Sequence, residues 1–387
     1  MNKLIFIALL LPILLIIGCV EGADTDVSPS IEPEEPEIMN NKPTPEPTPE
    51  LSPTPEPTPT PEPMPEPITE PLRFGFIDAH ADTPSRVLAL DSGNQNLFDN
   101  PELHVDFKRL SEFDAPVQVF VAWCPSAFVD TAFEYTNLMF DFLEEEIKKH
   151  NDLIEIALDL DDIKRIASQG KISAVLAIEG GEALMGKIEN LDYFYDRGVR
   201  IFGLTWNREN ELGFGQGTGS TRGLKPFGIE VIKRMDELGM IADVSHLNEA
   251  GFWDVHNHIT RPYMASHSNA FALFPHNRNL KDDQIMAIVE SGGVIGFNMY
   301  PPFISSNKRT TVDDVLAHFR HFIEIGAGQH VGLGCDFDGI DETPVEITDV
   351  SSLKMFAEKL ADEFGDDMAL GIMERNFYEF FVRYFEG

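Results

Sequence analysis

Cysteine is scarce in this sequence, which has three in 387 residues. Three cysteines cannot form the disulfide framework that holds many small secreted domains together. Cys124 and Cys335 are both flanked by apolar, strand-like residues. We expect these two to be buried free thiols, with a disulfide between them as the alternative. The fold should therefore depend on a hydrophobic core.

Basic residues are also few, since 29 lysines and arginines stand against 65 aspartates and glutamates, a net charge of −36. Residues 20–70 hold 13 of the acidic residues and one lysine, so the rest of the chain is strongly acidic too. This balance argues against nucleic acid, or an anionic membrane surface, as a partner bound through charge. Metal cations would be attracted instead.

Long apolar runs are absent after residue 19, since no run there approaches the roughly 20 residues that a membrane-spanning helix requires. In the first 19 residues, Lys3 precedes an apolar run that ends in Ile16-Ile17-Gly18-Cys19, and we predict a signal peptide over residues 1–19. Its end resembles a bacterial lipoprotein signal. That resemblance implies cleavage before Cys19, lipid on the Cys19 sulfur and an extracytoplasmic protein anchored to the bacterial cell membrane. An uncleaved anchor helix is the alternative.

Residues 20–71 are rich in proline, threonine and glutamate, and the run Pro43-Thr44-Pro45-Glu46 recurs with little change as far as Pro67. Charged, proline-rich repeats cannot bury a core and favour extended polyproline conformation. We predict a disordered linker over 20–71 that holds a single domain, residues 72–387, away from the membrane. That domain is long enough for one large α/β fold.

Apolar strand-like runs alternate with amphipathic helical patterns through residues 72–387. The runs lie at 74–82, 117–122, 173–178, 199–205, 240–245, 262–266, 293–297 and 331–335. Helical patterns fill the gaps, for example at 131–149, 226–238, 281–291, 311–326 and 368–385. This count predicts a (β/α)8 TIM-type barrel. A doubly wound open sheet is the alternative, but no Gly-x-Gly-x-x-Gly sequence follows any run.

Six residues suited to bind a metal stand where five of these runs end. They are His80, Asp82, Glu179, His246, His267 and Asp336. The active site of such a barrel lies at the carboxyl ends of its strands, so these side chains should converge. Imidazole and carboxylate suit zinc or a similar divalent ion. Six candidates exceed the needs of one tetrahedral ion, and two ions about 3.5–4 Å apart with a bridging carboxylate account for them better.

Each of these residues also has a structural interpretation. A lone histidine is often a hydrogen-bonded core residue, and Glu179 before Gly180-Gly181 could cap a helix. We expect Asp243, inside its run, and Asp338, beyond its run, to support the ligands at most. Histidines in helical or loop contexts are not expected to bind metal; they are His256, His258, His276, His321 and His330.

A family resemblance rests on six motifs in order along the chain. These are His80-x-Asp82, Ile178-Glu179-Gly180, Asp243-Val244-Ser245-His246, Ser266-His267-Ser268-Asn269-Ala270, Arg278-Asn279-Leu280 and Gly334-Cys335-Asp336-Phe337-Asp338-Gly339. Together they resemble the membrane (renal-type) dipeptidases, zinc peptidases of the amidohydrolase-like barrel group, over essentially all of residues 74–385. The resemblance implies hydrolysis of L-L, and also L-D, dipeptides by a metal-bridging hydroxide. Family members often form homodimers, so a homodimer is a further expectation.

The resemblance also implies roles for individual residues. His80 and Asp82 would bind one zinc ion, His246 and His267 a second, and Glu179 would bridge the two. Asp336 would act as the acid–base residue beside the bridging water. Arg278 would bind the carboxylate of the small peptide substrate, and Tyr300 would lie near that substrate.

One departure from the family pattern affects the substrate side. Most members have a histidine in a Leu-Thr-His sequence, and this chain has Leu204-Thr205-Trp206-Asn207. That histidine is expected to hold the substrate's carbonyl oxygen, and loss of such a donor can cost about 10²–10³ in rate. The Trp206 indole N–H, Asn207, Arg208 or Asn210 could substitute. The departure leaves open a hydrolase of another amide, such as a lactam or an N-acyl amino acid. A metal-retaining surface binding protein is a separate alternative, although a binding protein has no need for a bridging carboxylate together with Asp336.

Overall fold

The computed structural model describes residues 75–386. The predicted signal peptide (1–19), its lipidation site Cys19 and the predicted linker (20–71) lie outside the described residues. Among residues 75–386, no helix combines the length and the apolar character that crossing a membrane requires.

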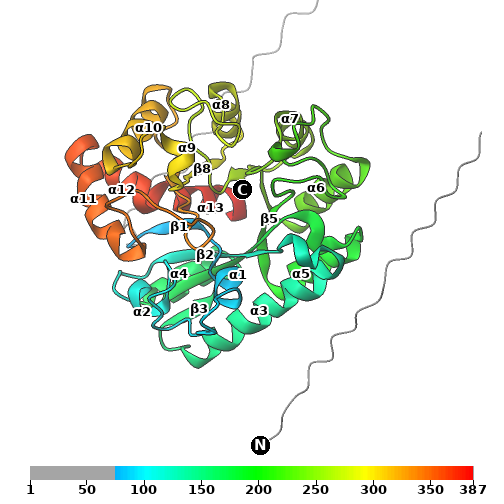
Figure 1. The fold of residues 1–387 in the computed structure, drawn as a ribbon, viewed down its shortest axis with the longest axis horizontal. Coiled ribbons are helices and arrows are strands. Elements are labelled where there is room, and N and C mark those ends of the chain that lie inside the picture. Colours follow the sequence, from blue (N-terminus) through cyan, green and yellow to red (C-terminus); the bar gives the residue numbers. More distant parts are fainter. Residues whose placement is uncertain (1–74, 387) are drawn as a thin grey trace, which may run out of the picture. The chain divides into compact units, whose positions relative to one another are not determined.

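Eight parallel strands close into a barrel, as the sequence predicts (Figure 1). The strands are β1 (Ile77–Ala81), β2 (Val117–Trp123), β4 (Ile172–Glu179), β5 (Val199–Gly203), β6 (Ile241–Asp243), β7 (Met264–Ala265), β8 (Val294–Phe297) and β9 (Val331–Leu333). Each pairs with the next, the β2–β4 pairing continues the sheet, and β9 returns to β1. The (β/α)8 prediction is confirmed, and the open-sheet alternative is wrong.

Helices surround the barrel. The longer ones are α3 (Ala132–Lys149), α4 (Leu160–Ser168), α5 (Ile188–Arg197), α6 (Pro226–Leu238), α7 (Glu249–His258), α8 (Asp282–Glu290), α10 (Val312–Glu324), α11 (Leu353–Phe364) and α13 (Asn376–Glu386). Shorter ones are α1 (Thr83–Leu88), α2 (Phe107–Leu110), α9 (Pro301–Ile304) and α12 (Asp366–Leu370). Local sequence explains their ends: α6 begins at a proline and stops at Gly239, which has the positive φ that glycine tolerates.

Apart from shifts of a few residues at the ends of elements, two features differ from the sequence predictions. The three-residue strand β3 (Ile154–Ile156) was not predicted; it pairs with the amino end of β4, ahead of the β4 residues that pair with β5. The helix predicted over 368–385 is interrupted, because a π-helical turn at Gly371–Arg375 separates α12 from α13. The predicted helix over 226–238 has the observed bounds of α6.

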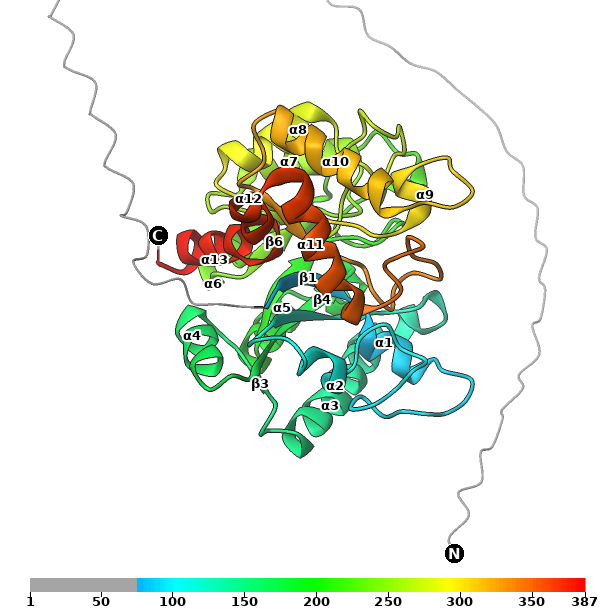
Figure 2. The same ribbon diagram turned by 90° about the vertical axis from the view of Figure 1, so that its left-hand side faces the viewer.

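The barrel interior is apolar below the strand ends. Val175 and Ala177, which share a face of β4 with Glu179, belong to a buried cluster with interior residues of the other strands and with α13. At β9, Gly332 leaves room for the Phe377 ring of α13, because a Cβ at position 332 would lie 2.6 Å from that ring. The C-terminal helix therefore packs directly against a barrel strand, and Figure 2 shows it from the side.

Cys124 and Cys335 are both free, so the alternative of a disulfide between them is wrong. Cys335 is buried as expected, whereas Cys124 is only half-buried.

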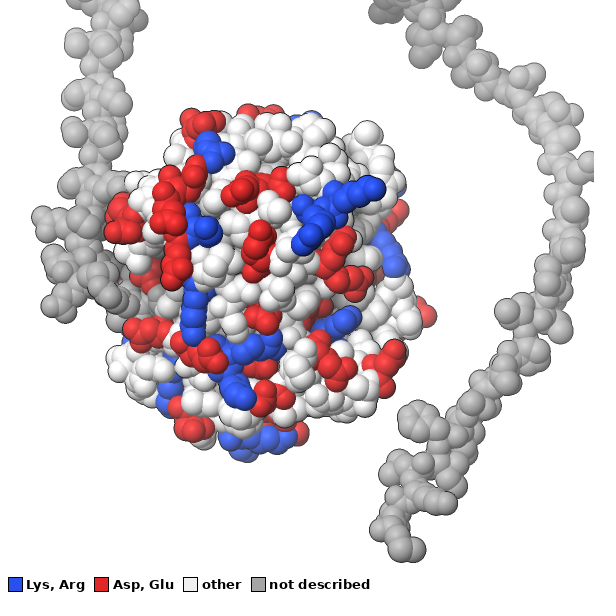
Figure 3. All heavy atoms as spheres, turned by 60° about the vertical axis from the view of Figure 1, so that its left-hand side comes forward, with Lys and Arg blue, Asp and Glu red and all other residues white. Residues whose placement is uncertain are grey.

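The surface is charged, and Figure 3 shows acidic side chains over one face with lysines and arginines among them. Several form ion pairs, such as Arg165–Glu155 at 2.7 Å and Lys281–Glu249 at 2.8 Å. Exposed pairs of this kind contribute about 0–1 kcal/mol each. The fold therefore depends mainly on its buried apolar residues.

Candidate metal centre and active site

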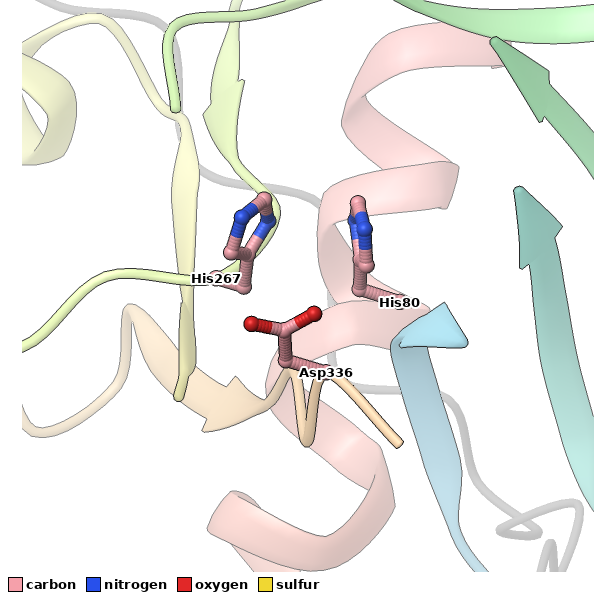
Figure 4. Close-up of side chains that lie close together, drawn as sticks. All are labelled: His80, His267 and Asp336. Carbon is pink, nitrogen blue, oxygen red and sulfur yellow. The ribbon is translucent and has the colours of Figure 1, made fainter. Parts of the chain in front are cut away.

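Six side chains meet at the carboxyl end of the barrel. His80 lies in β1 and Asp82 just after it, Glu179 ends β4, and His246, His267 and Asp336 lie in the loops after β6, β7 and β9. None is more than 9% exposed. Figure 4 shows His80, His267 and Asp336 pointing toward one another. The structure thus brings together all six residues that the sequence singled out.

Glu179 occupies the centre of this cluster. Its Oε1 lies 2.9 Å from His246 Nε2, 3.6 Å from His267 Nε2 and 4.0 Å from His80 Nε2. On the far side, His80 Nε2 lies 3.3 Å from Asp82 Oδ2. One carboxylate oxygen therefore faces the histidines of both expected metal positions.

Three overlapping groups have donor atoms within 4.8 Å of one another. They are His80 with Asp82 and Glu179, Glu179 with His246 and His267, and His80 with His267 and Asp336. The first two share Glu179 and match the ligand sets that the family resemblance implies.

Hydrogen bonding around the histidines indicates that a cation fits here. The Nδ1 atom of His246 lies 2.9 Å from Asn207 Oδ1, and that of His267 lies 2.8 Å from Ser266 Oγ. With these Nδ1–H groups donating to oxygen, the two Nε2 lone pairs face each other across 2.8 Å, beside Glu179 Oε1. Three acceptor atoms without a proton between them are repulsive, and a divalent cation satisfies all three.

Unpartnered carboxylate oxygens support the same conclusion. Asp82 Oδ1 and Glu179 Oε1 are buried and accept no hydrogen bond. Leaving a buried polar group unsatisfied costs about 1–3 kcal/mol, and more when it is charged. Histidine nitrogen and carboxylate oxygen are donors that zinc accepts, so the residues present fit the metal ions that the family resemblance implies.

Burial shifts the pKa of nearly every group in the cluster. It raises the pKa of Glu179 to about 7 and that of Asp336 to about 8. It lowers the pKa of His246 and His267 well below the ordinary value. Burial also lowers the pKa of His80, but hydrogen bonding to Asp82 and the nearby carboxylates outweigh it and raise this pKa to about 10. Without a cation the carboxylates are therefore costly to ionise, and bound cations would favour their charged form.

Asp336 is held at the edge of the cluster by a residue that the sequence reasoning missed. Asn298 Nδ2 donates a hydrogen bond of 2.8 Å to Asp336 Oδ2. Asn298 is itself fixed by Asn269, whose Oδ1 accepts from the Asn298 backbone N–H at 2.9 Å. The signal that could have found Asn298 is its position directly after β8, at the same end of the barrel. Asp336 also has a φ of +61°, a conformation that non-glycine residues seldom adopt.

Arg278 is a buried cation beside the cluster. It is 4% exposed, and its Nη2 donates to the backbone oxygen of His267 at 3.2 Å. Its Nε–H has no hydrogen-bond partner, and no carboxylate among residues 75–386 lies within ion-pair distance of it. Burial lowers the pKa of Arg278 from its usual range. A buried guanidinium with an unused N–H is suited to bind an anionic group.

A cavity of about 260 Å³ adjoins Arg278 and the cluster. Its lining includes His246, Ser268, Arg278, Asn279 and Gln216. Ser268 Oγ, Asn279 Oδ1 and Gln216 Oε1 are buried and lack partners, as the Arg278 Nε does. The cavity therefore joins the candidate metal centre to a wall with unused hydrogen-bonding groups.

The candidate substrate-binding residues in the loop after β5 lie at different distances from the metal cluster. The Trp206 ring lies 6.2 Å from the His246 ring and 5.0 Å from the ring of Trp123, which ends β2. Asn207 contacts His246 through its side-chain oxygen. Asn210 faces away from the cluster, because its Nδ2 donates to Leu204 O at 2.9 Å. The Arg208 guanidinium carbon lies 5.5 Å from the Trp206 ring centre.

Tyr300 lies outside the six-residue cluster. Its backbone N–H donates to Asn298 Oδ1 at 2.6 Å, and its ring packs 4.9 Å from the Phe303 ring. The Arg278 guanidinium carbon lies 5.5 Å from the same Phe303 ring. Tyr300 is therefore linked to both Asp336 and Arg278 through one intervening residue each.

Asp243 and Asp338 hold backbone and hydroxyl groups. Asp243 Oδ1 accepts from the Ser245 and Ser266 backbone N–H groups, each at 2.9 Å. Asp338 Oδ2 accepts from the Thr83 hydroxyl at 2.6 Å. Both aspartates, and the five histidines not expected to bind metal, lie outside the clustered donor groups of residues 75–386.

Residues 72–382 match the family described as membrane dipeptidase, peptidase family M19. A Schizosaccharomyces pombe protein described as an uncharacterized dipeptidase is 37% identical over 210 residues, which cover 53% of this chain and 50% of that protein. The match thus spans about half the length of that relative.

Two solved structures resemble the chain over nearly their whole length. Dipeptidase AC, a metallopeptidase of family M19, is 26% identical with a TM-score of 0.76, covering 81% of this chain and 99% of that one. A Rhodobacter sphaeroides metallopeptidase with a bound phosphinate mimic of L-Ala-D-Ala is 25% identical with a TM-score of 0.74, covering 80% and 99%. Together with the family match and the metal-binding side chains at the barrel end, these comparisons show that the chain belongs to the membrane dipeptidases of family M19, metal-dependent peptide hydrolases.

Proposed function

We propose that this dipeptidase binds two zinc ions and cleaves L-L and L-D dipeptides outside the cytoplasmic membrane. One ion would be held by His80, Asp82 and Glu179, and the other by Glu179, His246 and His267. The central place of Glu179 Oε1, within 4.0 Å of three histidine Nε2 atoms, is the observation that carries the proposal.

When bound, the two ions would supply a water that ionises near neutral pH and would polarise the scissile carbonyl. Asp336 would take the proton of the attacking water and pass it to the leaving amine. The hydrogen bond from Asn298 keeps the Asp336 carboxylate turned toward His80 and His267. In this role Asp336 acts on protons, while the other five residues hold the ions.

Arg278 would bind the free carboxylate of the substrate. Its buried, unused Nε–H and the partnerless Ser268 hydroxyl both line the cavity beside His246. If Arg278 binds the terminal carboxylate of the substrate beside the metal centre, only a short peptide fits between the two, which would restrict cleavage to dipeptides. The L-Ala-D-Ala mimic bound to the R. sphaeroides relative supports a D-residue at the carboxyl side.

Trp206 would be the residue of the loop after β5 that contacts the substrate. The Asn207 side-chain oxygen is engaged with His246, and Asn210 is engaged with the backbone of its own loop. Trp206 remains beside the metal cluster with an indole N–H, which could donate to the substrate's carbonyl oxygen. Tyr300 would lie near the substrate, since it is linked to Asp336 through Asn298 and to Arg278 through Phe303.

The location is part of the proposal. The apolar start of the sequence and Cys19 support lipid attachment to the outer side of the bacterial cell membrane, with residues 20–71 as a spacer. Substrates would then be short peptides present outside the cytoplasm.

A dipeptide panel tests the substrate assignment. We expect the full-length protein with zinc to hydrolyse L-Ala-L-Ala and L-Ala-D-Ala. We also expect their C-terminal amides to lose about 10–100-fold in kcat/KM, since a hydrogen bond to a charged group contributes about 1.5–3 kcal/mol. Arg278→Met should lose activity on the free acids to the level of the amides and change the amides little. Equal cleavage of acids and amides by the wild-type protein would refute the role of Arg278, and cleavage of lactams or N-acyl amino acids alone would refute the dipeptide assignment.

A further inference from the structure

Ser266 lies directly behind the metal-binding cluster and contacts histidines of both expected metal positions. It follows β7 and is 1% exposed. Its Oγ lies 3.0 Å from His80 Nδ1 and 2.8 Å from His267 Nδ1, and it donates a short hydrogen bond to Asp243 Oδ2.

The hydrogen-bonding capacity of a hydroxyl fixes the direction of these contacts. A serine hydroxyl has one proton to donate and two lone pairs that accept. Asp243 is a carboxylate and can only accept, so the Ser266 proton is directed to it. Both remaining lone pairs then face a histidine Nδ1, and each of these nitrogens must carry a proton. Ser245 Oγ, at 3.4 Å from Ser266 Oγ, lies too far away to compete with Asp243 for the Ser266 proton.

We infer that Ser266 is a positioning residue that holds His80 and His267 in the same tautomer, with Nδ1 protonated and Nε2 free. This inference rests on the proposed two-ion site, and it adds that a single hydroxyl couples the two metal positions. Removing that hydroxyl should weaken both ions together, because each loses the partner that orients one of its histidines.

The surroundings fix Ser266 in place. Asp243 accepts from the backbone N–H groups of Ser245 and Ser266, so its carboxylate cannot rotate away. Gly296 lies in β8 and Gly334 directly follows β9, and an added Cβ at these positions would lie 1.9 Å and 1.8 Å from the Ser266 backbone oxygen. Only glycine permits this close approach, and the tight packing keeps the hydroxyl between the two histidines.

Asn207 provides the contrasting case. Its Oδ1 lies 2.9 Å from the Nδ1 of His246, a residue of the second metal position alone. Variants of Ser266 and Asn207 should therefore differ in how many zinc ions they bind more weakly. Loss of the Asn207 oxygen should weaken one ion, and loss of the Ser266 hydroxyl should weaken two.

Zinc affinity measured by competition with a chromophoric chelator tests the inference on the full-length protein. We expect Ser266→Ala to bind two zinc ions, each about 10–100-fold more weakly than the wild type. Asn207→Ala should show that loss for one ion only. Ser173→Ala is the matched control, since Ser173 is a fully buried serine without a hydrogen-bond partner near the other end of β4; it should bind both ions as the wild type does.

Ser266→Thr keeps a hydroxyl, so it should restore affinity for both ions if it folds, as judged by circular dichroism. Wild-type affinity for both ions in Ser266→Ala, or weakening of only one, would overturn the inference. A wild-type protein that binds fewer than two ions would instead refute the proposed two-ion function. The two failures are therefore distinguishable from the same titration.

Discussion

The two ends of the barrel are built from the same strands and differ in what they bury. Toward the amino ends, Val175 and Ala177 of β4 lie in an apolar cluster that α13 completes. At the carboxyl end, Glu179 of the same strand lies among histidines and carboxylates whose pKa values are shifted. Two of the five non-glycine residues with positive φ among residues 75–386, His246 and Asp336, belong to this cluster.

This difference indicates that the amino end of the barrel provides stability and the carboxyl end provides the catalytic site. Burial of apolar side chains stabilises the amino end and the helices packed on it. The carboxyl end accepts unsatisfied polar atoms and unusual backbone conformations, which cost free energy and persist where function requires them. Variants at the two ends should therefore separate catalysis from stability.

The largest effect is expected from Asp336→Asn. This change keeps the shape of the side chain and its contact with Asn298, and removes the ability to accept a proton. We expect kcat to fall about 10²–10⁴-fold, the usual contribution of general acid–base catalysis, while zinc content by mass spectrometry stays at two ions. Full activity in this variant would show that the proton-transfer role is wrongly assigned.

The next largest effect is expected from Phe377→Ala at the opposite end of the barrel. This variant should lose stability and keep its catalytic activity. Phe377 is 1% exposed and packs on Gly332, and removing a buried phenylalanine ring typically costs about 3–5 kcal/mol. Urea unfolding should show this loss, with kcat/KM unchanged. Phe128→Ala is the control, because Phe128 is 42% exposed and should change stability by less than about 0.5 kcal/mol. A drop in kcat/KM for Phe377→Ala would contradict the proposed separation.

A smaller effect is expected from pH on the metal-free protein. Glu179 and Asp336 have folded pKa values of about 7 and 8, above their unfolded values, so stability falls as pH rises through these values. His80, with its pKa raised to about 10, acts in the same direction above its unfolded value of about 6.5. His246 and His267, with lowered pKa values, oppose this only below about 6.5.

The urea midpoint of chelator-treated protein should therefore decrease from pH 7 to pH 9. Zinc-loaded protein should change less, because bound cations favour the ionised carboxylates. An increase in the midpoint of the chelated protein over this range would contradict the assigned electrostatics.

Much of the fold and the cluster was predictable from the sequence. Apolar runs that stop at His80, Glu179, His246, His267 and Asp336 identify both the strands and their active end. The rule that parallel barrel strands share one catalytic face brings these residues together. The six candidates do converge, although they are spread over more than 250 positions of the sequence.

The supporting residues could not be predicted in the same way. Ser266 and Asn298 act through single hydrogen bonds, whose partners depend on strand register and loop conformation. Asn207 was expected near the substrate, and its contact with His246 appears only in three dimensions. The short strand β3 has only three residues, Ile154–Ile156, and pairs with β4 alone, outside the closed ring of eight strands.

Removal and stepwise return of zinc would test the central claim most directly. The full-length protein is stripped with a chelator, and hydrolysis of L-Ala-D-Ala is followed as zinc is added in known molar ratios. The account predicts no hydrolysis without metal and recovery that is complete at two ions per chain. Full activity in the stripped protein, or complete recovery at one ion per chain, would contradict a two-ion centre at the carboxyl end of this barrel.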